Sequence, residues 1–454
     1  MKNAVILCAG EGTKFWPYAS VRCKVMMPIS NKPIVAYSVD ALVEMGFENI
    51  VIVGNRFIEE IVAYFRDDTR VKVIADDKPK GTAFSLLKAR DLVDGDFLAL
   101  HGDTIAAPED LRALADTFTS SGENTALVDV IRDRTGDVIG CDLSDGCVSG
   151  ILGHPRGKIT HFFGGFALKH SFFDSLKFSS NRFRSTEVGM MVPVESYLES
   201  ALEEEMRRGM KLLAVEAKQR VFDIDKPWHV LDANSEINSR RCGALTKNEL
   251  AQGASIDPTA VIGGFVKLGK NSTIGKNVII EGNIIVGDNT EIKNGAIVSG
   301  DVVIGDECKI RNACFIEGAT TIGNECIVSH AAEVDGVILD RVYLYHYMEW
   351  GGIIGTNTDL GAATVCGSLR FDDFITMQKV KGRREFHRGS GDAVFLGDYC
   401  RTGVNAILMP GVKVGVYSVV GAGVTLNKDV PDRTLIYNEQ TLVERTWGPE
   451  KYGW

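Results

Sequence analysis

A glycine-rich loop near the N-terminus is the first segment whose residue types and spacing could do chemistry. Residues 10–14 read Gly-Glu-Gly-Thr-Lys and follow an apolar run, residues 3–9, that is typical of a buried parallel strand. Two glycines that flank one residue allow backbone N–H groups to face an anion closely. The loop therefore predicts a phosphate site, although a plain strand-to-helix turn would use the same glycines.

Asp103 is a second candidate, because it follows the apolar run 97–100 and is expected at the end of a strand. Alternating segments predict a parallel sheet with helices on both faces, and such sheets bind ligands at the carboxyl ends of their strands. Carboxylate oxygen suits Mg²⁺, although a solvated turn residue would look the same in isolation. The expected helices are 34–44, 58–65 and 82–92, and the expected strands are 50–53, 71–74 and 97–100.

The segment around the loop carries a longer motif. Residues 7–33 read LCAGEGTKFWPYASVRCKVMMPISNKP. This stretch resembles the signature loop of the sugar-phosphate nucleotidyltransferases, L-x-x-G-x-G-T-R-x-x-P followed by the lysine of R-P-K-x-x-x-P. The resemblance implies that Lys14 and Lys24 are catalytic. It also implies the following nucleotide-binding residues, which include part of a later Gly-Thr-Ala turn: Leu7, Ala9, Gly10, Gly12, Thr13, Gly81, Thr82 and Gly102.

The same resemblance implies two Mg²⁺ ligands that are far apart in the chain. One is Asp103, and the other is Asp223, because VFDIDKPW at residues 221–228 resembles the family's W-x-D-x-G-T-P segment. Three glycines are implied in sugar binding: Gly140, Gly164 and Gly165.

This domain departs from the family's pattern at several positions. Lys14 replaces an arginine, which keeps the charge and loses the bidentate fork, and Asp225 replaces a glycine. The family's Glu-Lys-Pro reads Gly153-His154-Pro155, and the segment HFFGGFAL lacks the usual asparagine. A missing transition-state contact costs ~1–3 kcal/mol, so we expect a different sugar, slow turnover, or binding alone.

A six-residue register extends from Ile256 to Val334, and every position in it is aliphatic and branched. This period fits neither a helix nor an alternating strand, but it fits stacked coils of short strands with glycine or asparagine at the corners. Such coils bury one continuous aliphatic column. The pattern resembles the hexapeptide repeat of left-handed β-helix acyltransferases; a β-solenoid of another kind is the alternative.

We therefore predict an α/β Rossmann-like nucleotidyltransferase domain followed by an all-β left-handed parallel β-helix of hexapeptide repeats. The predicted divisions are the nucleotidyltransferase domain at residues 1–230, a helical linker at 231–253, an acyltransferase-like β-helix at 254–430 and a tail at 431–454. Nearly the whole chain is similar to the archaeal-type bifunctional sugar-1-phosphate nucleotidylyltransferase/acetyltransferases.

This second resemblance implies an acetylation base at His346, although a histidine packed among tyrosines is the alternative. The residues expected to approach coenzyme A are Ala362, Gly403, Asn405 and Ala422. The expected acceptor pocket disagrees with the family, because Glu317 and Asp335 stand where relatives have cations and Glu349 replaces a tyrosine. Three carboxylates would repel a sugar phosphate, so we expect weak or absent acetylation of glucosamine-1-phosphate and a cationic or neutral amine as acceptor.

Composition narrows the partners. The net charge of −10 argues against nucleic acid, and no apolar run reaches the ~18 residues of a membrane span. The ten cysteines form no C-x-x-C pair, and Cys308, Cys314 and Cys326 share one repeat position, so we expect them to stack rather than to bind metal. A reducing cytoplasm is the natural location.

The leading hypothesis is a Mg²⁺-dependent enzyme that transfers a nucleotidyl group from UTP or dTTP to a sugar-1-phosphate, of the N-acetylglucosamine or glucose type. Its second domain would use acetyl-CoA, and the resemblance implies a homotrimer formed through the β-helix. The alternative is a catalytically degenerate nucleotide-sugar-binding or scaffold protein of the same fold. The base, the sugar and the acyl acceptor stay open.

Overall fold

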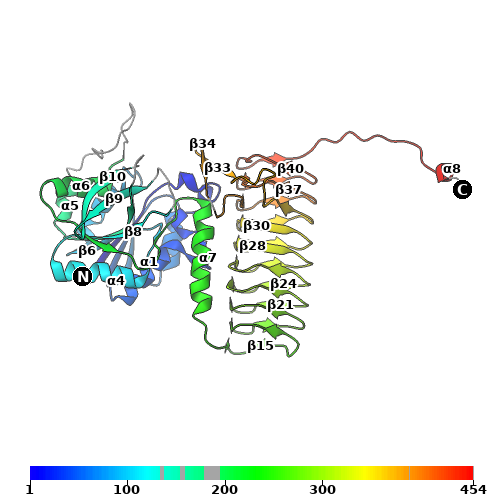
Figure 1. The fold of residues 1–454 in the computed structure, drawn as a ribbon, viewed down its shortest axis with the longest axis horizontal. Helices are drawn as coiled ribbons and strands as arrows, with labels where there is room; N and C mark the ends of the chain where they lie inside the picture. Colours follow the sequence, from blue (N-terminus) through cyan, green and yellow to red (C-terminus); the bar gives the residue numbers. More distant parts are fainter. Residues whose placement is uncertain (133–137, 154–158, 178–194, 388, 453–454) are drawn as a thin grey trace.

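The computed structural model describes residues 1–132, 138–153, 159–177, 195–387 and 389–452. A Rossmann-like α/β domain lies beside an upright stack of β-coils, and the C-terminal tail extends away from the coils (Figure 1). No helix in the described residues is long and apolar enough to cross a membrane.

Within the described residues, the N-terminal domain contains a nine-stranded sheet. Its strand order is β5 (Val71–Ala75), β4 (Asn49–Gly54), β1 (Asn3–Cys8), β6 (Phe97–His101), β11 (His161–Leu168), β8 (Thr125–Val130), β12 (Leu213–Glu216), β10 (Cys147–Gly153) and β9 (Ile139–Ser144). The first four strands are parallel, as expected. The sheet also contains β11, a strand that was not predicted from the sequence, and this strand lies antiparallel to both β6 and β8.

Helices cover both faces of this sheet. Successive side chains of β1 point to opposite faces and are apolar on both, so each face needs a covering layer. Ile6 packs in a core with α1 (Ile34–Glu44) and α4 (Pro108–Ser121), and Leu7 packs in another core with α3 (Thr82–Lys88) and α6 (Leu198–Arg207). Helices α1 and α2 (Ile58–Phe65) have the predicted bounds. The helix expected over 82–92 ends earlier, and a short 3-10 turn follows at Arg90–Leu92.

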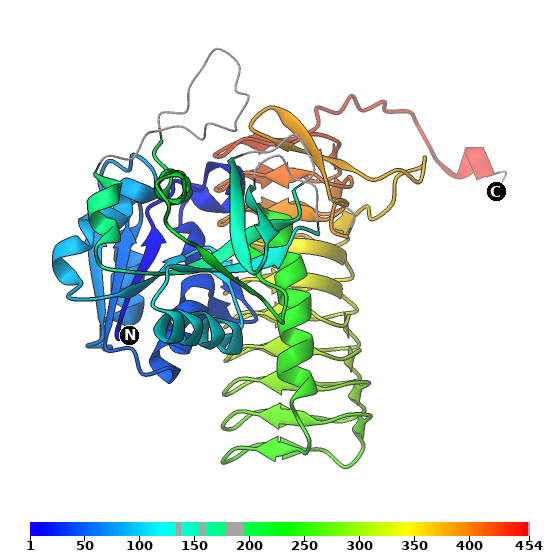
Figure 2. The same cartoon turned by 60° about the vertical axis from the view of Figure 1, so that its left-hand side comes forward.

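One long helix, α7 (Pro227–Gly243), connects the two parts of the chain and lies along the coils (Figure 2). It begins and ends earlier than the helix expected within 231–253. The side-chain amide of Asn238 donates to the backbone oxygens of Ala319 (3.0 Å) and Thr320 (3.1 Å). Because Asn238 is fully buried, its amide cannot bond to water, and these two hydrogen bonds replace those lost to water on folding.

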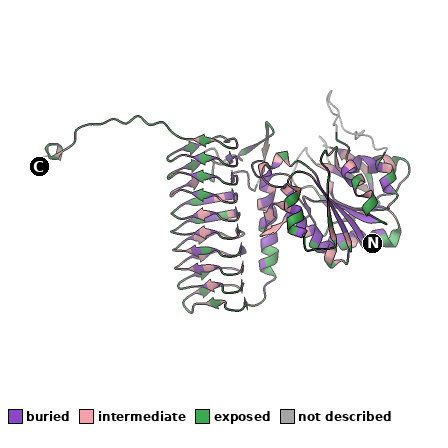
Figure 3. Cartoon of the chain, turned by 180° about the vertical axis from the view of Figure 1, so that it is seen from behind, coloured by how far each residue is buried: buried purple, intermediate pink, exposed green. Residues whose placement is uncertain are grey.

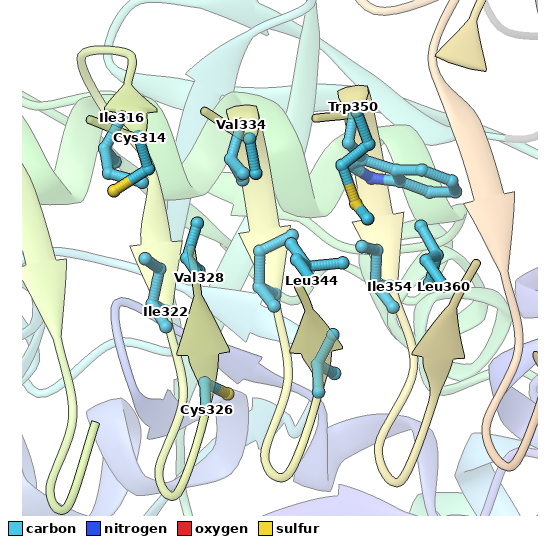
Figure 4. Packing of buried hydrophobic residues seen from close by; sticks show 14 of the residues in the cluster. Cys314, Ile316, Ile322, Cys326, Val328, Val334, Leu344, Trp350, Ile354 and Leu360 are labelled. Carbon is cyan, nitrogen blue, oxygen red and sulfur yellow. The ribbon is translucent and has the colours of Figure 1, made fainter. Parts of the chain in front are cut away.

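The described coils form stacks of short parallel strands, such as β18 (Thr273–Ile274), β21 (Glu291–Lys293) and β24 (Lys309–Arg311). Each coil takes 18 residues here, or three hexapeptides, as the pairing of Ile274 with Ile292 shows. The inward residues form the continuous column that the register predicts (Figure 4). Asparagines hold the predicted left-handed corners, with Asn271 at φ 57° and Asn289 at φ 53°. The left-handed β-helix is therefore confirmed.

Cys308, Cys314 and Cys326 are buried in this column as free thiols, as expected. The break in the register after Val334 has a structural cause. There β28 (Glu333–Ile338) passes the corner as one strand and pairs with β30 (Glu349–Ile354).

The two domains share a core rather than a loose contact. Phe15 and Tyr18 from the segment after the glycine loop are fully buried in one cluster with Val337, Ile353 and Phe395 of the β-helix. The Tyr18 hydroxyl donates to the Ile353 backbone oxygen at 2.9 Å. Buried residues gather in the sheet of the N-terminal domain and along the strands of the coils, whereas the described part of the tail is mostly exposed (Figure 3). The glycine loop is therefore anchored directly on the coils.

Candidate active site

The glycine loop leaves β1 at Cys8 and enters a three-residue 3-10 turn, Thr13–Phe15. Gly12 has φ 63°, and a Cβ there would lie 3.2 Å from the Lys24 Cβ. Gly102 packs under the same strand, where its N–H donates to the Leu7 oxygen at 2.9 Å and a Cβ would lie 2.3 Å from the Cys8 sulfur. Because no α-helix starts at the loop, an anion there would depend on loop N–H groups and nearby lysines.

Asp103 and Asp223, far apart in sequence, are neighbours in space. Strand β13 (Phe222–Asp223) pairs antiparallel with β7 (Thr104–Ile105), so Asp223 lies opposite Thr104. The Ile224 N–H donates to the Asp103 backbone oxygen at 2.9 Å. The structure thus brings both predicted metal ligands to the end of β6, beside the glycine loop.

The predicted catalytic lysines are both paired with carboxylates at this place. Lys24 forms an ion pair with Asp103, and the Lys14 ammonium lies 3.0 Å from the Asp225 carboxylate. Burial would lower the pKa of Lys24, but the charges of Asp103 and Asp225 raise it above its ordinary value. The two residues that differ from the family pattern, Lys14 and Asp225, therefore pair with each other. Two such differences within one predicted site were the signal that could have revealed this pair.

Burial, together with the neighbouring charges of Asp103 and Asp225, raises the pKa of Asp223 to about 7. His101 lies nearby, and its ring Nε2 donates a 3.0 Å hydrogen bond to the Glu199 carboxylate. Burial lowers the pKa of His101, but that bond and the Glu199 charge together raise it to about 9. The motifs did not reveal Glu199, because only the folded sheet brings α6 to the end of β6.

We predict that Mg²⁺ binding releases a proton near neutrality. Because the Asp223 carboxyl is protonated below its raised pKa, affinity should fall by roughly tenfold per pH unit below pH 7 and level off above it. Calorimetric titration of the protein with MgCl₂ from pH 5.5 to 8.5, in two buffers of different ionisation enthalpy, measures both the affinity and the released proton. An affinity that is constant across this range would contradict the prediction.

The predicted base-binding turn is locked by its surroundings. Gly81 has φ 105°, and a Cβ would lie 2.2 Å from the Ser196 backbone oxygen. The Thr82 hydroxyl accepts a 2.8 Å hydrogen bond from the Leu198 N–H. This contact explains the glycine, and it ties the turn to the start of α6.

Replacing Gly81 by alanine is therefore expected to lower the free energy of unfolding by about 2–4 kcal/mol, through steric overlap and an unfavourable φ. Urea denaturation followed by fluorescence measures the loss. Gly243→Ala is the matched control, because no atom lies within 4 Å of the added Cβ at the end of α7. Equal midpoints for the two variants would disprove the steric argument.

The predicted sugar-binding glycines are explained by packing. A Cβ on Gly140 would lie 2.7 Å from the His161 oxygen, one on Gly164 would lie 3.2 Å from Leu127, and one on Gly165 would lie 2.6 Å from Leu100. Their contact with a sugar stays a prediction. His154 and Pro155 lie outside the described residues. A cavity of about 90 Å³ opens beside Asp223 and is lined by Phe162, Arg220 and His229, among others.

The predicted acyl-site residues lie along one corner of the coils. The His346 ring stacks on His330 with centroids 5.0 Å apart. Later coils continue this corner along the stack, where the Asn405 N–H donates to the Ala362 oxygen at 2.9 Å and Gly403 packs against Ala422. The structure therefore brings these five predicted residues into a single row.

The predicted acceptor acids gather elsewhere, in a cavity of about 480 Å³ between α7 and the coils. Glu317, Asp335 and Glu349 line it together with Glu333, whereas His346 is not among its lining residues. Burial and the negative charges of the three other acids raise the pKa of Glu317. Burial alone raises the pKa of Asp335. The cavity is therefore strongly acidic.

Comparison with known proteins supports the two-part organisation. Residues 3–140 match the nucleotidyl transferase family model, and residues 246–344 match the model of the GMPPB C-terminal domain. The chain is 32% identical over 97% of its length to the bifunctional protein GlmU of Methanococcus maripaludis strain C7, covering 98% of that protein. It is 29% identical to GlmU of strain S2, with 97% of this chain and 98% of that protein covered.

A bifunctional sugar-1-phosphate nucleotidylyltransferase/acetyltransferase of Sulfurisphaera tokodaii is 26% identical and covers 94% of this chain and 98% of its own. These matches extend through both domains and confirm the archaeal-type resemblance. The chain therefore belongs to the family of the bifunctional GlmU proteins.

Proposed function

We propose that the N-terminal domain transfers a nucleotidyl group from UTP or dTTP to a sugar-1-phosphate and releases pyrophosphate. The acceptor would be of the N-acetylglucosamine-1-phosphate or glucose-1-phosphate type. The observation that supports this most is that Asp103 and Asp223 lie close together beside the glycine loop. Lys24 pairs with Asp103 at this place, and Lys14 of the loop pairs with Asp225.

The residues present fit a Mg²⁺ ion. Two neighbouring carboxylates supply oxygen ligands; burial and, after it, the charges of Asp103 and Asp225 raise the pKa of Asp223, and a bound cation would offset both. In the described part of the chain, no group of three or more His, Cys, Asp or Glu side chains is arranged to hold a metal. Mg²⁺ bound by one or two carboxylates plus substrate phosphates needs no third side chain. When bound, it would neutralise phosphate charge and align the two substrates.

The reaction requires positioning and charge neutralisation from the protein. An oxygen of the sugar phosphate attacks the α-phosphorus, the bond from that phosphorus to the β-phosphate bridge breaks, and pyrophosphate leaves with the electron pair. The attacking oxygen is already anionic, so no general base is needed. Lys14 and Lys24 would exchange their carboxylate partners for phosphate oxygens, and loop N–H groups would donate to the triphosphate.

Pyrophosphate release measured across a panel of triphosphates and sugar-1-phosphates tests the proposal and names the base and sugar. A second candidate function, nucleotide-sugar binding without turnover, is favoured by the pairing of both lysines with aspartates, which would compete with phosphate. Tight binding of a nucleotide sugar with no pyrophosphate release from any pair would support that candidate and contradict the first.

We also propose that the β-helix carries an acetyl-CoA-dependent site at the row formed by His346, Ala362, Gly403, Asn405 and Ala422. We keep a cationic or neutral amine as the proposed acceptor because Glu317, Asp335 and Glu349 stand where the resemblance places the acceptor pocket, although in a single chain they line a cavity whose lining does not include His346. We further propose a homotrimer formed through the β-helix; the molar mass from light scattering checks it, and a monomer mass at micromolar concentration would contradict it.

A further inference from the structure

A β-hairpin inserted in the β-helix leaves the coils and reaches the N-terminal domain. It consists of β33 (Met377–Val380) and β34 (Arg383–Phe386) and lies between the coil strands β32 (Val365–Cys366) and β35 (Val394–Leu396). In Figures 1 and 2 the hairpin stands at the N-terminal end of α7. Val380 is buried in the shared core with Trp228 and Phe222, the residue before Asp223.

The hairpin and the segment that follows it are held from both sides. The Gln378 side chain is fully buried and donates to the Gly391 oxygen at 2.8 Å, and the ammonium of Lys413, on a neighbouring coil, donates to the Lys379 oxygen at 3.3 Å. On the other side, the His387 ring lies 2.9 Å from the Asp232 carboxylate of α7. Because this segment is fixed to both domains, a change in its position in the β-helix would also shift the residues that it contacts in the N-terminal domain.

A row of alternating charges extends from the hairpin to the glycine loop. The Glu385 carboxylate lies 2.8 Å from the Lys226 ammonium, which lies 3.7 Å from Asp225, and Asp225 lies 3.0 Å from Lys14. Only 1% of the Lys226 side chain is exposed. A buried ammonium needs close counter-charges, so its two carboxylate neighbours are held in place by it.

We propose that Glu385 is a positioning residue of the nucleotidyl-transfer site, acting through Lys226 and Asp225 on Lys14. The hairpin of the β-helix would thus complete the phosphate site of the other domain. This inference rests on the proposed function. If Glu385 loses its charge, Lys226 draws Asp225 more strongly, Asp225 holds Lys14 less well, and the lysine is no longer placed for the triphosphate.

The matched variants are Glu385→Gln and Arg384→Gln, which remove one charge each from adjacent hairpin residues, the second of them exposed. We expect Glu385→Gln to raise the KM for the triphosphate on the order of tenfold and Arg384→Gln to leave it unchanged. Glu385→Asp should recover part of the loss. In a Lys14→Met background, Glu385→Gln should have no further effect, because its route to the phosphate is already cut.

A purely structural role would give different results. If the Glu385→Gln effect persists in full in the Lys14→Met background, the inference is wrong. Lys226→Met provides a second variant in case Glu385→Gln folds poorly, since it removes the buried ammonium of the row and leaves only the partly exposed carboxylates of Glu385 and Asp225. Adding Glu385→Gln to the Lys226→Met protein should leave its KM unchanged, because Glu385 no longer has an ammonium through which to act, and a further rise in KM in the double variant would also overturn the inference.

Hydrogen–deuterium exchange of residues 9–16 gives a readout that needs no turnover. Exchange should accelerate in Glu385→Gln and stay at the wild-type rate in Arg384→Gln. Equal rates in all three proteins would overturn the inference even if pyrophosphate release is normal. Conversely, a wild-type protein that releases no pyrophosphate contradicts the proposed function, and the exchange rates still decide whether the hairpin positions the loop.

Discussion

Replacing Asp103 by asparagine is expected to lower the rate of pyrophosphate release by roughly 10³-fold, about 4 kcal/mol of transition-state stabilisation. The change removes one of two carboxylates that meet at the end of β6, and it also removes the charge that pairs with Lys24. A neutral amide is a poor Mg²⁺ ligand, so charge on the reacting phosphates would stay uncompensated. Steady-state assays with the most active substrate pair measure the loss.

Asp116→Asn is the matched control, because this aspartate is exposed on α4 in the same domain. It should retain the wild-type rate. The Asp103→Asn protein should also show a lower Asp223 pKa, since a neighbouring negative charge is gone. Wild-type turnover by a folded Asp103→Asn variant would rule out the proposed metal site.

The second large effect is expected in the β-helix, where glucosamine-1-phosphate should be acetylated at least about a thousandfold less efficiently than an unphosphorylated amine. Each carboxylate at ~4 Å from a phosphate charge costs about 4 kcal/mol at an effective dielectric near 20. Glu317, Asp335 and Glu349, which stand where the resemblance places the acceptor pocket, line one cavity, and burial raises the pKa values of Glu317 and Asp335 there.

Transfer of radiolabelled acetyl groups from acetyl-CoA, with glucosamine-1-phosphate and glucosamine compared side by side, measures this preference. The triple variant Glu317→Gln, Asp335→Asn, Glu349→Gln should narrow the difference, because it removes the repulsion and keeps the shapes of the side chains. Faster acetylation of the phosphorylated sugar by the wild-type protein would show that these acids do not line the acceptor site.

Much of the candidate site could be predicted from local sequence, because its motifs are short and their geometry follows from strand ends. The glycine loop lies at the end of a predicted strand and the Gly-Thr-Ala turn at the start of a predicted helix, and the assignment of Asp223 as the second candidate metal ligand needed only the segment 221–228. The sheet was predicted less well. Nothing in HFFGGFAL distinguishes a parallel strand from β11, which is antiparallel because of the order in which distant segments pair.

The sequence by itself determined that the second half is a stack of coils, because one aliphatic position every six residues has no other way to bury its side chains. It also predicted which residues of the first half would carry chemistry. Only the tertiary structure decided their partners: Lys14 with Asp225, Lys24 with Asp103, and the acids around a single cavity. It also placed the β33–β34 hairpin against α7. Such contacts join side chains that are far apart in the sequence. A local sequence pattern does not specify which distant segments will pack against each other, so it could not predict these contacts.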